Sequence, residues 1–82
     1  MIFNAHIDIM PLKELLDPQG KAVNQSLHSL QLQAIQDVRI GKHIQLLIEA
    51  QHQEEAKEIA ENACKKMLCN PVMETFSVTI AN

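Results

Sequence analysis

The sequence predicts an α+β domain with the element order β-α-β-β-α-β, the arrangement found in ferredoxin-like folds. Short runs with an apolar residue at every second position alternate with longer runs in which apolar residues recur every three or four positions. Gly and Pro stand between these runs, where turns are expected. We therefore expect one domain over residues 1–82, with a four-stranded antiparallel sheet and both helices packed on one face.

The first expected strand covers residues 2–10. Its side chains alternate, so that one face would carry Phe3, Ala5, Ile7 and Ile9. A period of two over this length is typical of a strand with one buried face. Pro11 has no N–H group for the sheet, so the strand should end there.

The first helix is expected to begin at Asp17-Pro18-Gln19-Gly20, after a short helical turn or irregular link at 12–16. Asp is a favoured N-cap, and Pro is favoured at the first helical position. The stripe that would face the sheet contains Ala22, Val23, Leu27 and Leu30. Gly20 in the first turn costs about 1 kcal/mol relative to Ala, which suggests that another group approaches the backbone closely there.

Residues 34–40 and 43–50 are two short runs rich in strand-forming residues, separated by Gly41-Lys42. Val38 and Ile40 would share a face in the first run. Two such runs around a glycine predict a β-hairpin.

The second helix is expected over residues 53–68. Apolar residues recur there at helical spacing, Glu54 and Glu55 lie in the first turn, and Lys65 and Lys66 lie near the end, all of which favours a helix. Asn70-Pro71 should stop it, and residues 72–80 then give the last strand.

The sheet face opposite the helices would be mixed in character. It would carry Asn4, His6, Asp8, Arg39, Leu47, Thr75, Ser77 and Thr79. Such a face can be solvated, or it can be a subunit interface in which Leu47 would be an anchor. The pattern leaves both alternatives open.

Composition argues against several classes of partner. The formal charge is -3 and the only aromatic rings of the Phe, Trp and Tyr type are Phe3 and Phe76, so we expect no nucleic acid. The apolar runs are far shorter than the ~20 residues that span a bilayer, and no signal peptide is evident, so we expect no membrane and a cytoplasmic location. Cys64 and Cys69 are then expected to be reduced thiols.

The residues predict no catalytic, cofactor-binding or metal site. Cys64 and Cys69 do not have a zinc-knuckle spacing, and the four histidines are scattered. No serine or cysteine has an evident base beside it, and the two glycines form no phosphate loop. Composition and spacing alone therefore indicate a domain built for binding or assembly.

Three segments resemble the PurS family. They are the opening His6-Ile7-Asp8-Ile9-Met10-Pro11-Leu12-Lys13 with Leu16-Asp17-Pro18-Gln19-Gly20-Lys21-Ala22, then Val38-Arg39-Ile40-Gly41-Lys42, and finally Ala63-Cys64-Lys65-Lys66-Met67-Leu68-Cys69-Asn70-Pro71-Val72. The resemblance covers essentially the whole chain, with the segments in order.

This resemblance implies a function in de novo purine synthesis. PurS is the smallest component of phosphoribosylformylglycinamidine synthase, whose PurQ component releases ammonia from glutamine and whose PurL component uses ATP. The resemblance implies a non-catalytic subunit that bridges PurL and PurQ and is itself a homodimer or a dimer of dimers. It implies no cofactor in this chain, while the complex uses ATP, Mg²⁺ and glutamine.

Eight residues are candidate partner contacts. Asp17, Pro18, Gln19 and Gly20 match the family's signature turn, Arg39, Gly41 and Lys42 match its hairpin, and Leu47 comes from the open sheet face. The alternative for the two motifs is a helix cap and a hairpin turn without a partner. The alternative for the whole chain is a ferredoxin-like regulatory module that binds a small ligand at a dimer interface; an independent small enzyme is a third hypothesis.

Overall fold

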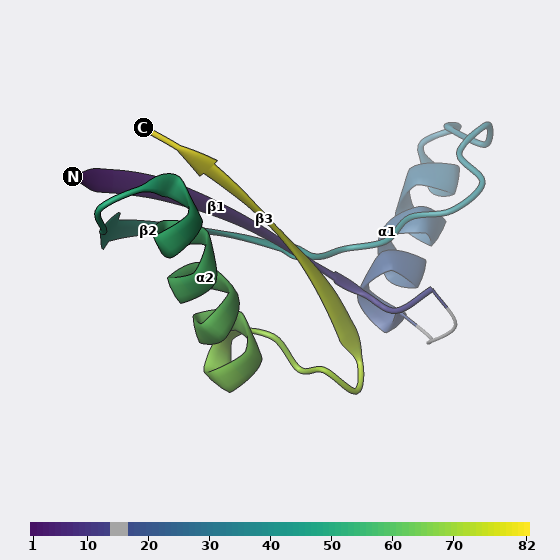
Figure 1. Ribbon diagram of the computed structural model, residues 1–82. Helices are drawn as coiled ribbons and strands as arrows, with labels where there is room; N and C mark the ends of the chain where they lie inside the picture. Colours follow the sequence, from purple (N-terminus) through teal and green to yellow (C-terminus); the bar gives the residue numbers. More distant parts are fainter. Residues whose placement is uncertain (14–16) are drawn as a thin grey trace.

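A computed structural model describes residues 1–13 and 17–82 of the chain (Figure 1). The elements follow in the order β1 (Ile2–Pro11), α1 (Pro18–Ser29), β2 (Lys42–Glu49), α2 (Gln53–Ala63), η1 (Cys64–Leu68) and β3 (Glu74–Ala81). The expectation for residues 12–16 falls mostly on 14–16, which lie outside the described residues.

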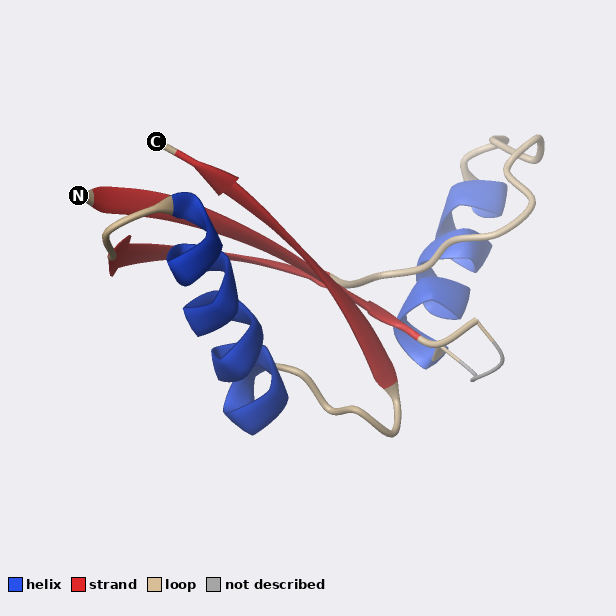
Figure 2. Cartoon of the chain, viewed as in Figure 1, coloured by secondary structure: helices blue, strands red, loops and turns tan. Residues whose placement is uncertain are grey.

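The three strands form one antiparallel sheet in the order β2-β1-β3, with β1 in the centre (Figure 2). At the middle of the sheet Ile7 pairs with Ile44 on one side and with Val78 on the other. The alternation predicted for β1 is confirmed, because Phe3, Ala5, Ile7 and Ile9 are all buried. Helix α2 covers this face and closes the core with Ala56, Ala60 and Cys64.

The prediction of a four-stranded sheet is wrong. Residues 34–40 form no strand, and the chain runs through Gly41 directly into β2 without a hairpin. A tight two-residue hairpin needs a residue with positive φ, and none of the described glycines has one. The backbone N–H of Ile40 donates instead to the Asp17 carboxylate, so the first turn of α1 takes the place of a neighbouring strand.

The prediction that both helices pack on one face of the sheet is also wrong, although the α+β class is correct. Helix α1 projects away from the sheet and from α2 (Figure 1). Its expected apolar stripe is largely exposed, with Val23 at 38% and Leu30 at 70%, and Gly20 is its one buried residue. The radius of gyration is consequently 16.2 Å, against about 12 Å for a compact domain of this length.

The helix expected over 53–68 is an α-helix only as far as Ala63. Its last turn, η1, is a π-helix, closed by a hydrogen bond in which the Cys69 N–H donates to the Cys64 carbonyl over 3.0 Å. This wider turn leaves both cysteines buried, Cys64 against the sheet and Cys69 at the end of the helix. Among the described residues, no helix combines the length and apolar character needed to cross a bilayer.

Candidate partner-binding surface

Asp17 joins helix α1 to the segment that leads into β2. Its Oδ1 atom accepts a hydrogen bond from the Gly20 N–H at 3.0 Å, which is the predicted N-cap. Its Oδ2 atom accepts from the Ile40 N–H at 2.9 Å. The Gly20 hydrogen bond first, then that of Ile40, and the nearby Arg39 charge hold the pKa of the Asp17 carboxyl below its usual value.

Gly20 has no room for a side chain. A Cβ atom there would collide with the carbonyl oxygen of Val38, and would lie 2.9 Å from the Val38 carbonyl carbon and 2.7 Å from Asp17 Oδ2. The close approach expected from the sequence is therefore made by the chain itself. The first turn of α1 and the segment around Val38 lie in backbone contact.

Gly41 and Lys42 lie at the junction between this segment and the sheet. A Cβ on Gly41 would meet the Ile9 carbonyl oxygen and the Met10 sulfur, so Gly41 lets the chain pass close to β1. Lys42 pairs with Ile9, and its ammonium lies 3.7 Å from Glu74 on β3. This ion pair spans the sheet, but it is more than half exposed at Lys42 and contributes little stability.

The structure brings seven of the eight predicted contact residues into one region and leaves one outside it. Pro18 and Gln19 are exposed at the start of α1, and Arg39 lies beside Asp17 rather than on the open sheet face where it was expected. Leu47 is 74% exposed on the face of the sheet opposite α2, where it pairs with Asn4. The region of Asp17, Gly20, Arg39, Gly41 and Lys42 is thus a joint between α1, its following segment and β2.

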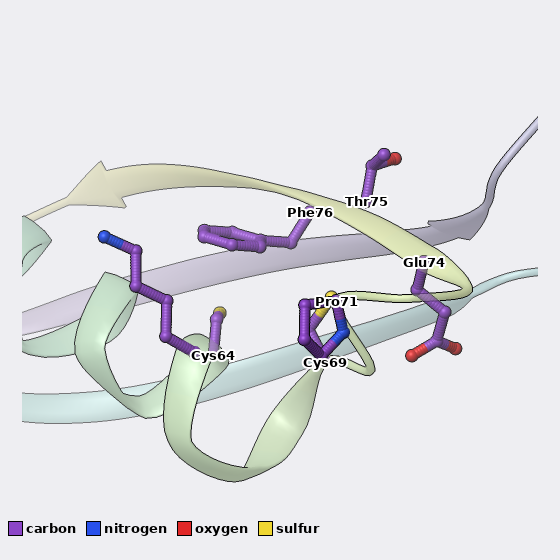
Figure 3. Close-up of a pocket in the computed structure, with 7 residues that line it drawn as sticks. Cys64, Cys69, Pro71, Glu74, Thr75 and Phe76 are labelled. Atoms are coloured by element: carbon purple, nitrogen blue, oxygen red, sulfur yellow. The ribbon is translucent and has the colours of Figure 1, made fainter.

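Sequence reasoning missed a groove between η1 and the start of β3 (Figure 3). It has a volume of about 430 Å³, and Cys64, Cys69, Pro71 and Phe76 form much of its wall. Burial raises the pKa of both thiols, and each thiol also has a negative neighbour that acts in the same direction. Both cysteines therefore serve as packing residues, not as activated nucleophiles.

A polar chain on the open sheet face was also missed. His43 Nδ1 lies 2.7 Å from Asp8 Oδ1, and its Nε2 lies 3.4 Å from Nδ1 of His6. Asp8 pairs with His43 across the strands, so register explains the contact, but sequence alone did not give the register. Within residues 1–13 and 17–82, no three His, Cys, Asp or Glu side chains are grouped to hold a metal ion.

Comparisons of the sequence and of the fold with known proteins point to the same family. The family model described as "PurS: Phosphoribosylformylglycinamidine (FGAM) synthase" matches residues 4–82. Over 77 residues the chain is 34% identical to phosphoribosylformylglycinamidine synthase subunit PurS of Thermotoga maritima, covering 94% of each. Over 66 residues it is 44% identical to the same subunit of Bacillus subtilis, covering 79% of this chain and 77% of that relative.

The fold agrees with the sequence comparison. A chain in the solved structure of PurLQS from Thermotoga maritima matches this one with a TM-score of 0.91 and 32% identity, covering 99% of both chains. PurS of Bacillus subtilis matches with a TM-score of 0.87, also at 32% identity. Sequence and fold therefore place this chain in the PurS family, the small subunits of phosphoribosylformylglycinamidine synthase.

Proposed function

We propose that this chain is a non-catalytic subunit of phosphoribosylformylglycinamidine synthase that bridges the glutaminase component, PurQ, and the synthetase component, PurL, and supports ammonia transfer between them. The observation that carries this proposal is the end-to-end match to a chain of PurLQS, the assembly solved from Thermotoga maritima. In the proposed complex ATP, Mg²⁺ and glutamine are used by the larger components, and this chain holds none of them. The complex acts in the cytoplasm.

The elongated shape supports a function in assembly. Helix α1 and the segment 34–40 extend from the sheet (Figure 1). They contact each other at Asp17 and Gly20, and again where His28 Nε2 lies 2.8 Å from the Ile35 carbonyl oxygen. We assign the partner contacts to the joint of Asp17, Gly20, Arg39, Gly41 and Lys42, together with the exposed Pro18 and Gln19 beside it. Leu47 belongs to a second surface, through which two copies of the chain associate.

Sedimentation of the purified chain with PurQ and PurL components of the same organism tests this function. The chain is expected to sediment with the two components in the presence of glutamine and nucleotide, and to turn over neither ATP nor glutamine when alone. Separate sedimentation under all these conditions would refute the subunit assignment. If the purified chain alone hydrolysed ATP or glutamine, and further purification did not remove that activity, its non-catalytic character would be refuted.

A further inference from the structure

Two histidine side chains from neighbouring strands face each other on the open face of the sheet, opposite α2. His6 lies in β1 and His43 in β2, and they are 37 positions apart in the sequence. Nδ1 of His6 lies 3.4 Å from Nε2 of His43. The ring centroids are 5.5 Å apart, so these two nitrogens lie between the rings. The imidazoles therefore meet through their nitrogen atoms and not through their flat faces.

The spacing of these nitrogens suits a shared metal ion better than a hydrogen bond. Hydrogen bonds from N–H groups are usually no longer than about 3.2 Å. Two nitrogens that bind one tetrahedral zinc ion at about 2.05 Å lie about 3.3 Å from each other. The observed separation of 3.4 Å is close to this second distance. An ion between the rings would therefore need only a small movement of either side chain.

Asp8 holds His43 in the orientation that a metal ligand needs. Its Oδ1 atom lies 2.7 Å from Nδ1 of His43, and the two residues are paired directly across β1 and β2. An ionised carboxylate only accepts hydrogen bonds, so Nδ1 of His43 donates to it. In the neutral ring Nε2 then keeps its lone pair on the side of His6. Metal-binding histidines commonly donate their other N–H group to a carboxylate in this way.

The charges around the pair favour a cation. The strand residues of this sheet face include two carboxylates, Asp8 and Glu49, and neither Lys nor Arg. Lys42 is the one cationic residue of the three strands, and it pairs with the buried Ile9 on the opposite face. Both histidine rings are partly accessible, so an ion can reach them from solvent. The face therefore attracts a dissolved metal ion and gives it access.

We infer that His6 and His43 bind one Zn²⁺ ion on the open sheet face, through Nδ1 of His6 and Nε2 of His43. Imidazole nitrogen is a preferred ligand of Zn²⁺, and the nitrogen spacing fits tetrahedral coordination. Water fills the two remaining positions. Asp8 is a positioning residue, because it acts through the His43 ring. Most zinc sites have three or four protein ligands, so this site should bind more weakly than those, in the micromolar range.

Calorimetric titration of zinc chloride into the full, untagged chain tests the site. The unmodified chain should bind one ion per chain. His6→Gln and His43→Gln should each abolish this binding, because a single imidazole cannot chelate the ion. The matched control is His52→Asn, which removes an imidazole elsewhere and keeps a side chain that can cap α2. Its affinity should equal that of the unmodified chain, and thermal melts should show that all variants fold.

Two further measurements separate the ligands from the positioning residue. Nuclear magnetic resonance of the ring nitrogens should show shifts at Nδ1 of His6 and Nε2 of His43 when zinc is added, and none at His28 or His52. Asp8→Asn should weaken zinc binding about tenfold while the same two nitrogens still shift. An unchanged affinity in Asp8→Asn would overturn its assignment as a positioning residue.

Two results would overturn the site itself. Zinc binding that survives unchanged in His43→Gln would place the ion elsewhere, for example at the thiols of Cys64 and Cys69. Absence of saturable binding by the unmodified chain at millimolar zinc would show that the two rings do not share an ion. The inference does not rest on the proposed function, since sedimentation with the larger components tests that function without added zinc.

Discussion

Gly20 and Val38 are in contact through their backbones, because the Val38 carbonyl group occupies the space in which a side chain at position 20 would begin. Helix α1 has no other buried residue, so this contact and the hydrogen bond from the Ile40 N–H to the Asp17 carboxylate hold the start of the helix against the rest of the chain. Because of this close backbone contact, a single methyl group added at position 20 should disturb the joint.

Gly20→Ala should therefore destabilise the protein, although Ala is ordinarily the better helix former. A methyl group at this position forces the backbone of Val38 or of α1 to move, and overpacking of this kind costs about 1–3 kcal/mol. Urea unfolding measures the change, with Ser26→Ala on the exposed side of α1 as the matched control. The control should be neutral or slightly stabilising. A Gly20→Ala midpoint equal to that of Ser26→Ala would show that the contact is not tight.

The Asp17 carboxylate should make the stability depend on pH in the acid range. Its pKa is lowered in the folded state, chiefly by the Gly20 hydrogen bond, so the unfolded chain binds its proton at higher pH than the folded chain. Its stabilising contribution is therefore complete above the ordinary carboxyl pKa of about 4 and is lost as the pH falls through the lower, folded value. Urea midpoints of the unmodified protein and Asp17→Asn, measured from pH 7 to pH 2.5, should converge as the pH falls. A constant gap between the two would contradict this.

Both thiols should be protected from alkylation in the folded protein. Cys64 is fully buried and Cys69 is 7% exposed, and burial raises the pKa of each thiol, so little thiolate is present and reagent cannot reach it. At neutral pH, iodoacetamide should modify the native chain far more slowly than the chain unfolded in urea, as followed by mass spectrometry. Equal rates in the two states would show that the π-helical turn opens freely.

Leu47→Glu should lower the sedimentation mass of the isolated chain. Leu47 is 74% exposed on an open sheet face, and an exposed apolar side chain within a strand is a natural anchor for a second copy. The unmodified chain should sediment at micromolar concentration with a mass above that of one chain. Gln45→Glu adds the same charge two residues along β2 on the same open sheet face without removing an apolar side chain, and it is the control for charge alone. A single-chain mass for the unmodified protein would refute self-association.

Local periodicity was enough to predict β1, α2 and β3, because each of them has a regular apolar repeat on the face that packs into the core. It failed at residues 34–40, since Val38 and Ile40 have strand-like alternation but their backbones contact the start of α1, Val38 at Gly20 and Ile40 at Asp17. The decisive contact there is the hydrogen bond from Ile40 to Asp17, which joins residues far apart in sequence and leaves no mark on the local pattern.

Contacts between residues far apart in sequence also limit how much of the candidate surface can be predicted. The Asp17 cap and the special role of Gly20 are local, so sequence revealed both. The position of Arg39 near Asp17 depends on residues 34–40 leaving the sheet, so a four-stranded prediction placed Arg39 on the wrong surface. The motif resemblance located the region, but only the fold shows its shape.

The most direct test of the account is to titrate the chain into a fixed mixture of the glutaminase and synthetase components and measure amidine synthesis with glutamine and, separately, with ammonia. A bridging, non-catalytic subunit predicts that glutamine-dependent synthesis rises with added chain and reaches a plateau, while ammonia-dependent synthesis changes little. Glutamine-dependent synthesis at the full rate without the chain would contradict the central claim.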